Sequence, residues 1–197
     1  SDPAFSNSCT YLKMNSPRYI SIEGGISAVP EPLNLWTNYR GYNMLGLYYS
    51  NPAQYCFQFQ TVVLQTLAKT QKDIKTSFVI RERSLDSSIN VFAKSALNKG
   101  HLSDSEFQIL SGLKELMCEE FKLKTYRIIY LKTDPEVLSL EYLQELHSLH
   151  EEWLSKEPNV ITVDANREKN EVIREKNSID LFYYKEHYMY IKNFVDL

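Results

Sequence analysis

The sequence lacks three features that would each place the chain in a particular class of protein. Its 3 cysteines lie far apart without CxxC spacing, which argues against a disulfide framework and favours free thiols in a reducing compartment. No stretch approaches the roughly 20 consecutive apolar residues that span a membrane. The formal net charge of −3 gives no electrostatic reason to expect nucleic acid or an anionic membrane as a partner.

The remaining composition is that of an ordinary globular domain, with 43% hydrophobic and 24% charged residues. No repeat, low-complexity tract or linker divides the 197 residues, so we expect a single domain over residues 1–197 with a sizeable core. No signal or transit segment is visible in the sequence. We therefore expect a cytoplasmic protein, with the mitochondrion as the alternative compartment.

Short apolar segments alternate with longer amphipathic ones. They predict strands at residues 19–22, 28–29, 77–81, 127–131 and 160–163, and helices at residues 55–68, 103–120, 140–154 and 180–195. Ser103, followed by Glu106, forms a capping-box pattern at the start of one helix. The alternation predicts an α/β fold with a parallel sheet of about five strands and helices on both faces.

The first predicted strand runs directly into a pair of glycines, Gly24 and Gly25. A buried strand that ends in glycine is typical of a phosphate-binding loop, because backbone without side chains can turn its N–H groups toward oxyanions. The lysine and the Ser or Thr that complete such a loop do not follow here.

The spacing after this turn is also short for two interior strands, 20–22 and 28–29. Parallel neighbours need a crossover of about a dozen residues, and Pro30 and Pro32 fit poorly in a paired antiparallel strand. We therefore predict that segments are missing from the chain between residues 27 and 28 and near residues 138 and 139. A genuine deletion is the alternative.

Polar residues follow two of the predicted strands: Glu31 after one, and Glu82 with Arg83 after another. Function in parallel sheets collects at the carboxyl ends of the strands. Carboxylates, a guanidinium and a phosphate loop around one crevice would suit phosphoryl transfer, where catalysis is mostly positioning and charge stabilisation. The alternative is that Glu31 and Glu82 simply solvate strand ends.

A series of short motifs extends over most of the chain, from residue 19 to residue 166. They are Ser21-Ile-Glu-Gly, Val29-Pro-Glu-Pro-Leu-Asn-Leu-Trp36, Gly41-Tyr-Asn-Met-Leu, Phe57-Gln-Phe-Gln60, Glu82-Arg-Ser, Phe92-Ala-Lys, Ile129-Tyr-Leu-Lys-Thr-Asp-Pro-Glu136, Leu140-Glu-Tyr-Leu-Gln-Glu-Leu-His and His150-Glu-Glu-Trp153. In this order they resemble the deoxynucleoside kinases, the family of deoxycytidine, deoxyguanosine and mitochondrial thymidine kinases and the broad-specificity insect enzyme. No single motif is decisive, but their ordered conjunction is specific.

The resemblance implies a P-loop NTPase-like fold and an enzyme of nucleotide salvage that uses ATP and Mg²⁺ to phosphorylate a deoxynucleoside. It also implies a homodimer, with neither nucleic acid nor a membrane as partner. In the family, the glycine turn continues into a Gly-x-x-x-x-Gly-Lys-Ser/Thr loop and a long helix, and an arginine-rich lid precedes Leu-Glu-Tyr-Leu. Both segments are absent here, at the two predicted gaps.

The family pattern assigns catalytic roles to Glu31 and Arg83 and a metal-binding role to Glu82. It implies that Glu31 accepts the proton of the 5′-hydroxyl, that Arg83 holds the 5′ end beside this carboxylate, and that Glu82 belongs to the Mg²⁺ shell. The matches on the ATP side are Gly24 and Gly25 in the phosphate loop and Asp164 and Asn166 in a turn that resembles the adenine-contacting one.

The pattern also implies the nucleoside contacts. Tyr49 matches a tyrosine that binds the 3′-hydroxyl, and Gln60 matches an amide that reads the base edge as both donor and acceptor. Trp36, Phe59 and Phe92 match the aromatic walls around the base. As isolated residues, these three aromatics would be interpreted as ordinary core side chains.

Base preference follows from Val63, Leu67 and Ser88. Deoxycytidine kinases carry an arginine and an aspartate at the positions of Leu67 and Ser88, and an alanine at that of Val63, whereas this trio is closer to the insect and mitochondrial thymidine kinases. The resemblance therefore implies a pyrimidine-preferring enzyme with thymidine as its best substrate and deoxycytidine as a second one. Ile89 departs from the family, which usually has an arginine there.

Several alternatives remain open at this point. A catalytically inactive relative that serves as a binding or structural subunit would also lack the phosphate-loop lysine. A nucleoside-monophosphate kinase is disfavoured, because Gln60 and Glu31 suit a free 5′-hydroxyl. We interpret His147 and His150 as surface residues of a helix rather than metal ligands, and residues 183–190 as a packing helix.

Overall fold

The structure of the protein is a computed structural model. It describes residues 10–14, 18–22, 27–29, 31–72, 79–123, 125–132, 141–164, 166 and 188–193. Gly24, Gly25 and the junction near residues 138 and 139 lie outside the described residues.

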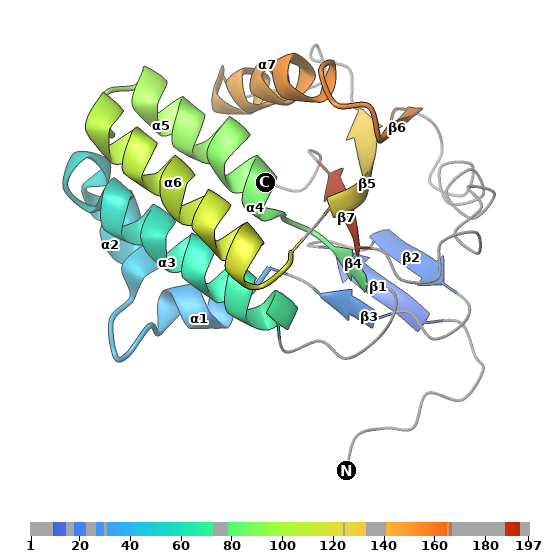
Figure 1. The fold of residues 1–197 in the computed structure, drawn as a ribbon, viewed down its shortest axis with the longest axis horizontal. Coiled ribbons are helices and arrows are strands. Elements are labelled where there is room, and N and C mark those ends of the chain that lie inside the picture. The colour runs from blue at the N-terminus through green and yellow to red at the C-terminus, as the bar shows by residue number, and fades with distance from the viewer. Residues whose placement is uncertain are drawn as a thin grey trace.

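A parallel sheet of five strands forms one layer of the fold (Figure 1). Its order is β3 (Ser27–Val29), β4 (Val79–Arg81), β7 (Tyr188–Asn193), β5 (Thr125–Lys132) and β6 (Val160–Asp164). All neighbouring strands in it run parallel. This confirms the predicted α/β fold with a parallel sheet, and β3, β4, β5 and β6 match predicted strands.

The strand predicted at residues 19–22 lies in a different sheet. β2 (Arg18–Ile22) pairs antiparallel with β1 (Thr10–Met14), with Met14 opposite Arg18. The sequence between these partners, Asn-Ser-Pro, consists of residue types that favour tight turns, which suits antiparallel pairing. The prediction that this strand joins the parallel sheet is therefore wrong, and β2 and β3 need no crossover between them.

The place between β4 and β5 is taken by β7, near the end of the chain. The sequence analysis predicts a helix over residues 180–195 and a packing helix over residues 183–190. The strand at Tyr188–Asn193 falls within the first range and overlaps the end of the second, so both predictions are wrong for the residues of this strand. The run Tyr-Met-Tyr-Ile combines aromatic and β-branched residues, which fit a pleated sheet better than a helix.

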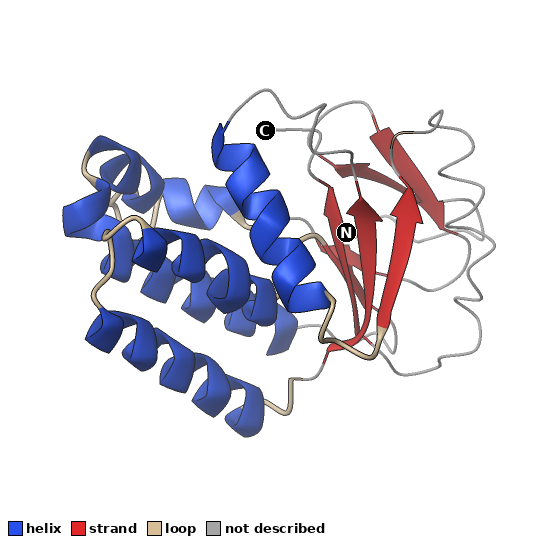
Figure 2. Cartoon of the chain, turned by 90° about the horizontal axis from the view of Figure 1, so that it is seen from above, coloured by secondary structure: helices blue, strands red, loops and turns tan. Residues whose placement is uncertain are grey.

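The described helices lie on one side of the parallel sheet (Figures 1 and 2). They are α1 (Leu33–Thr37), α2 (Met44–Ser50), α3 (Pro52–Lys72), α4 (Leu85–Ser87), a π-helical turn η1 (Ser88–Ala93), α5 (Lys94–Asn98), α6 (Asp104–Glu120) and α7 (Glu141–Leu154). Helices α3, α6 and α7 match predicted ones, and the helical layer on this face is confirmed. Within the described ranges, no helix combines the length and the apolar character needed to cross a bilayer.

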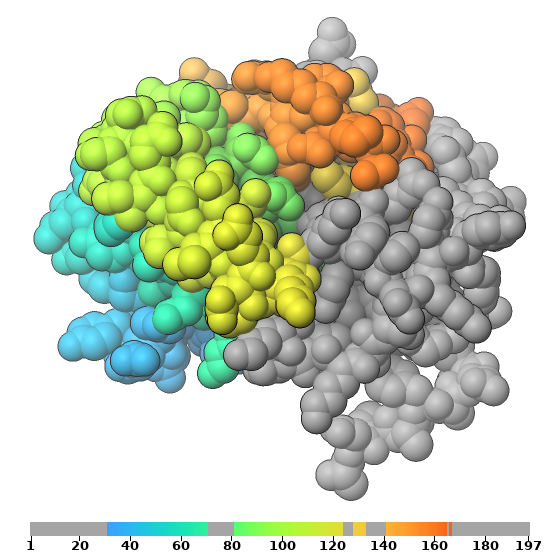
Figure 3. Space-filling view, viewed as in Figure 1, coloured from blue at the N-terminus to red at the C-terminus, as the bar shows by residue number. Residues whose placement is uncertain are grey.

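The buried core has two parts. One lies among the helices and includes Trp36, Phe59, Leu64 and Leu110. The other lies where α7 and η1 pack against β5 and includes Ile128, Tyr130, Leu146 and Trp153. In the space-filling view, α6 and α7 form much of the face turned to the viewer (Figure 3).

The two histidines of α7 are buried, so their interpretation as surface residues is wrong. His147 and His150 are only 4% and 0% exposed. They fall on the apolar face of α7, at helical spacing from Leu146 and its neighbours. His147 Nδ1 lies 3.2 Å from the hydroxyl of Tyr130, and His150 Nδ1 lies 2.8 Å from the carbonyl oxygen of Leu146. Hydrogen bonds to neighbours allow both rings to be buried.

The predicted capping box at the start of α6 is confirmed. The Ser103 hydroxyl accepts a hydrogen bond from the backbone N–H of Glu106, and the Glu106 carboxylate accepts one from the backbone N–H of Ser103 at 2.8 Å. The bond from the Ser103 backbone, followed by the one from its hydroxyl, holds the pKa of Glu106 below its usual value. The stabilisation from Glu106 is therefore present above the ordinary glutamate pKa and is lost as the pH falls through the lowered one.

Replacing Ser103 by alanine is expected to lower the free energy of unfolding by about 1 kcal/mol, because the N–H of Glu106 loses its acceptor. Urea denaturation followed by circular dichroism measures the change. Ser103→Asp is the matched control, since aspartate also caps helices, and it should stay close to the wild type. Equal stability of the wild type and Ser103→Ala would contradict the prediction.

Candidate active site

Two polar strand ends meet at one edge of the sheet because of the strand register. β3 and β4 pair in parallel with Val29 opposite Arg81. Glu31 and Arg83 each follow two residues beyond these partners, at the carboxyl ends where parallel sheets bind ligands. Glu82 is also close, since its Oε2 accepts a hydrogen bond from the backbone N–H of Glu31 at 3.3 Å.

Glu31 and Arg83 form an ion pair. Arg83 Nη1 lies 3.5 Å from Glu31 Oε1, and the two side chains are 5% (Arg83) and 13% (Glu31) exposed. Arg83 Nε donates to Ser88 Oγ at 3.1 Å, whereas the buried Nη2 has no hydrogen-bond partner among the described residues. The Glu31 carboxylate is therefore held in an ion pair rather than left free in solvent, and the Arg83 side chain keeps an unsatisfied buried donor beside it.

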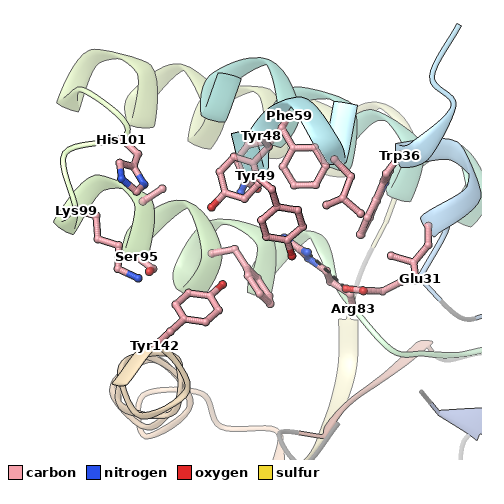
Figure 4. A pocket seen from close by; sticks show the side chains of 15 residues that line it. Glu31, Trp36, Tyr48, Tyr49, Phe59, Arg83, Ser95, Lys99, His101 and Tyr142 are labelled. Atoms are coloured by element: carbon pink, nitrogen blue, oxygen red, sulfur yellow. Dashed lines mark hydrogen bonds and ion pairs between the residues drawn. The ribbon is translucent and has the colours of Figure 1, made fainter. Parts of the chain in front are cut away.

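The ion pair lies at one end of a cavity of about 330 Å³ (Figure 4). This volume is within the range of small-molecule sites. The cavity brings together many of the predicted site residues, namely Glu31, Trp36, Tyr49, Phe59, Gln60, Arg83 and Phe92. They come from the ends of β3 and β4 and from α1, α2, α3 and η1.

Aromatic rings form much of the cavity wall. Phe59 meets Trp36 edge to face at 5.8 Å and stacks on Tyr48 at 5.0 Å, with the planes 13° apart. The guanidinium of Arg83 lies 3.7 Å from the ring centre of Phe92. Trp36 and Phe59 also belong to the buried core, so they serve packing and line the cavity together. Flat aromatic surfaces of this kind suit a nucleobase.

Gln60 presents a second unsatisfied polar group to the cavity. Its side chain is on α3 and is 3% exposed, and its Oε1 has no hydrogen-bond partner within the part of the chain that the structure describes. A buried amide oxygen without a partner costs about 1–3 kcal/mol. A ligand that donates an N–H at this point would remove that cost.

Other predicted site residues lie outside the cavity wall. Val63 and Leu67 are buried in the core, and Ser88 is buried against Arg83. Asp164 and Asn166 are exposed at the end of β6, where Asp164 Oδ1 accepts the backbone N–H of Asn166 at 2.9 Å. Their predicted roles in base preference and adenine contact stay predictions.

The cavity also includes residues that the sequence analysis did not single out. The polar ones are Tyr48, Ser95, Lys99, His101 and Tyr142. Helical spacing after Phe92 could have pointed to Ser95 and Lys99, and Tyr142 lies inside the Leu-Glu-Tyr-Leu motif. Burial, with a smaller contribution from Cys56, raises the pKa of Tyr48 to about 12. Tyr48 therefore keeps its proton at neutral pH and can donate a hydrogen bond.

Within the described ranges, no group of three or more His, Cys, Asp or Glu side chains could hold a metal ion. Mg²⁺, however, is usually held by one or two carboxylates together with phosphate oxygens and water. The half-buried carboxylate of Glu82, next to Glu31, fits that donor set.

Comparison with known proteins identifies the family. The model of the deoxynucleoside kinase family matches residues 18–183, a range that includes every residue of the cavity wall. The chain therefore belongs to the deoxynucleoside kinase family, whose members are ATP-dependent phosphotransferases with a P-loop kinase fold. This confirms the resemblance carried by the sequence motifs.

Individual relatives carry different substrate names. A probable deoxycytidine kinase of fowlpox virus is 31% identical over 182 residues, which cover 75% of each chain. The mitochondrial thymidine kinase 2 of Homo sapiens is 30% identical over 147 residues, covering 66% of this chain and 56% of that protein. The thymidine kinase of Ictalurid herpesvirus 1 is 27% identical over 164 residues, covering 76% of this chain and 71% of its own.

The alignments are longer than the parts of this chain that they cover. The one with the fowlpox protein extends over 182 positions but includes only 75% of the 197 residues here. Some positions of that relative therefore have no counterpart in this chain. The predicted missing segments would leave such positions, and their location between residues 27 and 28 and near 138 stays a prediction.

Proposed function

We propose that the protein transfers the γ-phosphate of ATP to the 5′-hydroxyl of a pyrimidine deoxynucleoside, with thymidine favoured, in nucleotide salvage. The observation that carries the proposal is the Glu31–Arg83 ion pair at one end of a nucleoside-sized aromatic cavity. In the same wall, Gln60 adds a buried oxygen that no described residue hydrogen-bonds.

In the proposed reaction, the nucleoside lies with its 5′-hydroxyl beside Glu31. The Glu31 carboxylate accepts the hydroxyl proton as the 5′-oxygen forms its bond to the γ-phosphorus and the bond from phosphorus to the β,γ-bridging oxygen breaks, which leaves ADP. Arg83 stabilises the negative charge of Glu31, and its Nη2, which is unsatisfied among the described residues, would donate to the 5′-oxygen or to the incoming phosphate. The aromatic walls orient the base and exclude water.

ATP and Mg²⁺ are the cofactors of this proposal. Bound Mg²⁺ would neutralise charge on the phosphates, and Glu82 is the described residue that would hold it. We also propose that the protein is a cytoplasmic homodimer. The exposed apolar side chains Ile109 and Leu116 on α6 support the dimer, since they would be covered by a second copy.

The preference for pyrimidines is supported by the amide of Gln60 in the cavity wall. Gln60 can face either thymine or cytosine, because an amide has both a donor and an acceptor. Leu67 and Ser88 are uncharged, whereas deoxycytidine kinases carry an arginine and an aspartate at these positions. Thymidine kinases are also among the relatives. Thymidine is therefore the substrate proposed first, and deoxycytidine the second.

The test is an assay of the purified protein with ATP, Mg²⁺ and each of the four natural deoxynucleosides. We expect thymidine to give the highest kcat/KM and deoxycytidine the next. Phosphorylation of purines alone would contradict the proposed site. Turnover of none of the four would favour a catalytically inactive relative, the candidate that the missing phosphate-loop lysine supports. Sequencing the transcript between the codons for residues 27 and 28 separates the two, since a Gly-Lys-Ser/Thr motif there supports the enzyme.

A further inference from the structure

A network of four side chains joins the end of α5 to the start of α7, at the end of the cavity away from Glu31 (Figure 4). Ser95 and Lys99 lie one turn apart on the α5 side, and Tyr142 and Glu145 lie one turn apart on α7. Lys99 Nζ lies 2.6 Å from Glu145 Oε2, and Ser95 Oγ donates to Glu145 Oε1 at 2.9 Å. Both carboxylate oxygens of Glu145 are therefore engaged by the α5 side.

The same lysine also contacts the ring of Tyr142. Lys99 Nζ lies 4.3 Å from the ring centre, within the range of a cation–π interaction. Lys99 and Glu145 are 36% and 26% exposed, so solvent screens their ion pair only in part. Because Glu145 anchors the ammonium group, the ammonium group in turn limits where the Tyr142 ring can lie.

Tyr142 is well placed to contact a ligand. Its side chain lines the cavity, rising from α7 toward Tyr48 and Tyr49 on the opposite wall (Figure 4). The residue is 40% exposed, so part of its surface is open. A bound ligand would cover part of this surface.

We infer that Lys99 is a positioning residue, which holds the Tyr142 ring in place at one side of the cavity so that the ring can pack against the bound nucleoside. The inference rests on the proposed function for the identity of the ligand. Lys99 acts on binding and not on phosphoryl transfer, because it lies at the far end of the cavity from Glu31.

The test compares thymidine kinetics of the full chain and its variants. Lys99→Ala should raise KM for thymidine about five- to tenfold, the effect of losing one cation–π contact and its anchor, with kcat within about twofold of the wild type. Lys99→Arg should restore most of the affinity, since arginine keeps both the charge and the ring contact. Lys156→Ala is the matched control, because Lys156 is an exposed lysine just after α7 that pairs with Glu152 and does not line the cavity.

Variants of Tyr142 test whether Lys99 affects thymidine binding through the Tyr142 ring. Tyr142→Ala should raise KM, Tyr142→Phe should keep it near the wild-type value, and Lys99→Ala should add less than about twofold in the Tyr142→Ala background. An unchanged KM in Lys99→Ala, or full additivity of the two changes, would overturn the inference. Thermal melts check that each variant is folded.

Failure of the proposed function would look different. If the wild type binds thymidine in equilibrium dialysis but does not phosphorylate it, the kinase proposal fails and the same variants are compared by their Kd for thymidine. A Kd raised about five- to tenfold in Lys99→Ala then supports the positioning role, and an unchanged Kd overturns it. No binding of thymidine by the wild type would overturn both proposals.

Discussion

Replacing Glu31 by glutamine is expected to lower kcat for thymidine by about 100- to 10,000-fold, the usual contribution of a general base. The amide has nearly the shape of the carboxylate but cannot take up the hydroxyl proton. KM should change little, because the aromatic walls and Gln60 are untouched. Steady-state rates with ATP and Mg²⁺ over a range of thymidine concentrations measure both constants.

Glu152→Gln provides the matched control for this substitution. Glu152 is exposed on α7, and its ion pair with Lys156 contributes little to stability. The control should keep the wild-type kcat. If Glu31→Gln kept more than about a tenth of the wild-type kcat, Glu31 could not be the base of the reaction.

Replacing Arg83 by methionine is expected to reduce kcat/KM by about 100- to 1,000-fold, as the loss of one preorganised charge-stabilising donor does in other enzymes. Methionine keeps the length and the apolar contact with Phe92 but removes the ion pair with Glu31. It also removes the buried Nη2 donor that we propose donates to the 5′-oxygen or to the incoming phosphate. The same steady-state assay gives kcat/KM, and thermal melts report how far the unpaired carboxylate of Glu31 lowers stability.

Two further variants show whether the guanidinium itself is required. Arg83→Lys keeps the charge but loses the fork of donors that reaches Glu31 and Ser88 together, so we expect an intermediate kcat/KM. Arg40→Met is the control, since Arg40 is exposed and its guanidinium contacts only the Tyr39 ring in the described contacts, at 5.9 Å. Wild-type kinetics in Arg83→Met would contradict the assigned role.

The meeting of Glu31 and Arg83 at one edge of the sheet could be predicted from the sequence because it depends on local rules. Glu31 and Arg83 follow short apolar strands, and parallel strands bring such positions to one edge. The capping box of α6 is likewise a pattern within a few residues. The resemblance to the family predicted that Tyr49, Gln60 and the aromatic residues would line the nucleoside site, and the structure brings them into one cavity wall.

The remaining features depend on contacts between distant segments. Neither the pairing of β2 with β1 nor the place of β7 in the sheet follows from the local pattern of either segment. The burial of His147 and His150 depends on the partners that the fold supplies, such as Tyr130 on β5.

The helical segment from α4 to α5 was not predicted from the sequence, for a different reason. Its buried side includes Ser87, Ser88 and Ser95, which obscure the apolar periodicity that marks a helix. The π-helical turn η1 also shifts the spacing within it. The network of Ser95 and Lys99 with α7 therefore became visible only in the structure.

The most direct measurement of the proposed site is a crystal structure of the full chain with thymidine bound. We expect the 5′-hydroxyl within hydrogen-bond distance of the Glu31 carboxylate, an N–H of the base on Gln60 Oε1, and the base among the rings of Trp36 and Phe59. Thymidine bound elsewhere, or with its base toward Glu31 and Arg83, would contradict the proposed site.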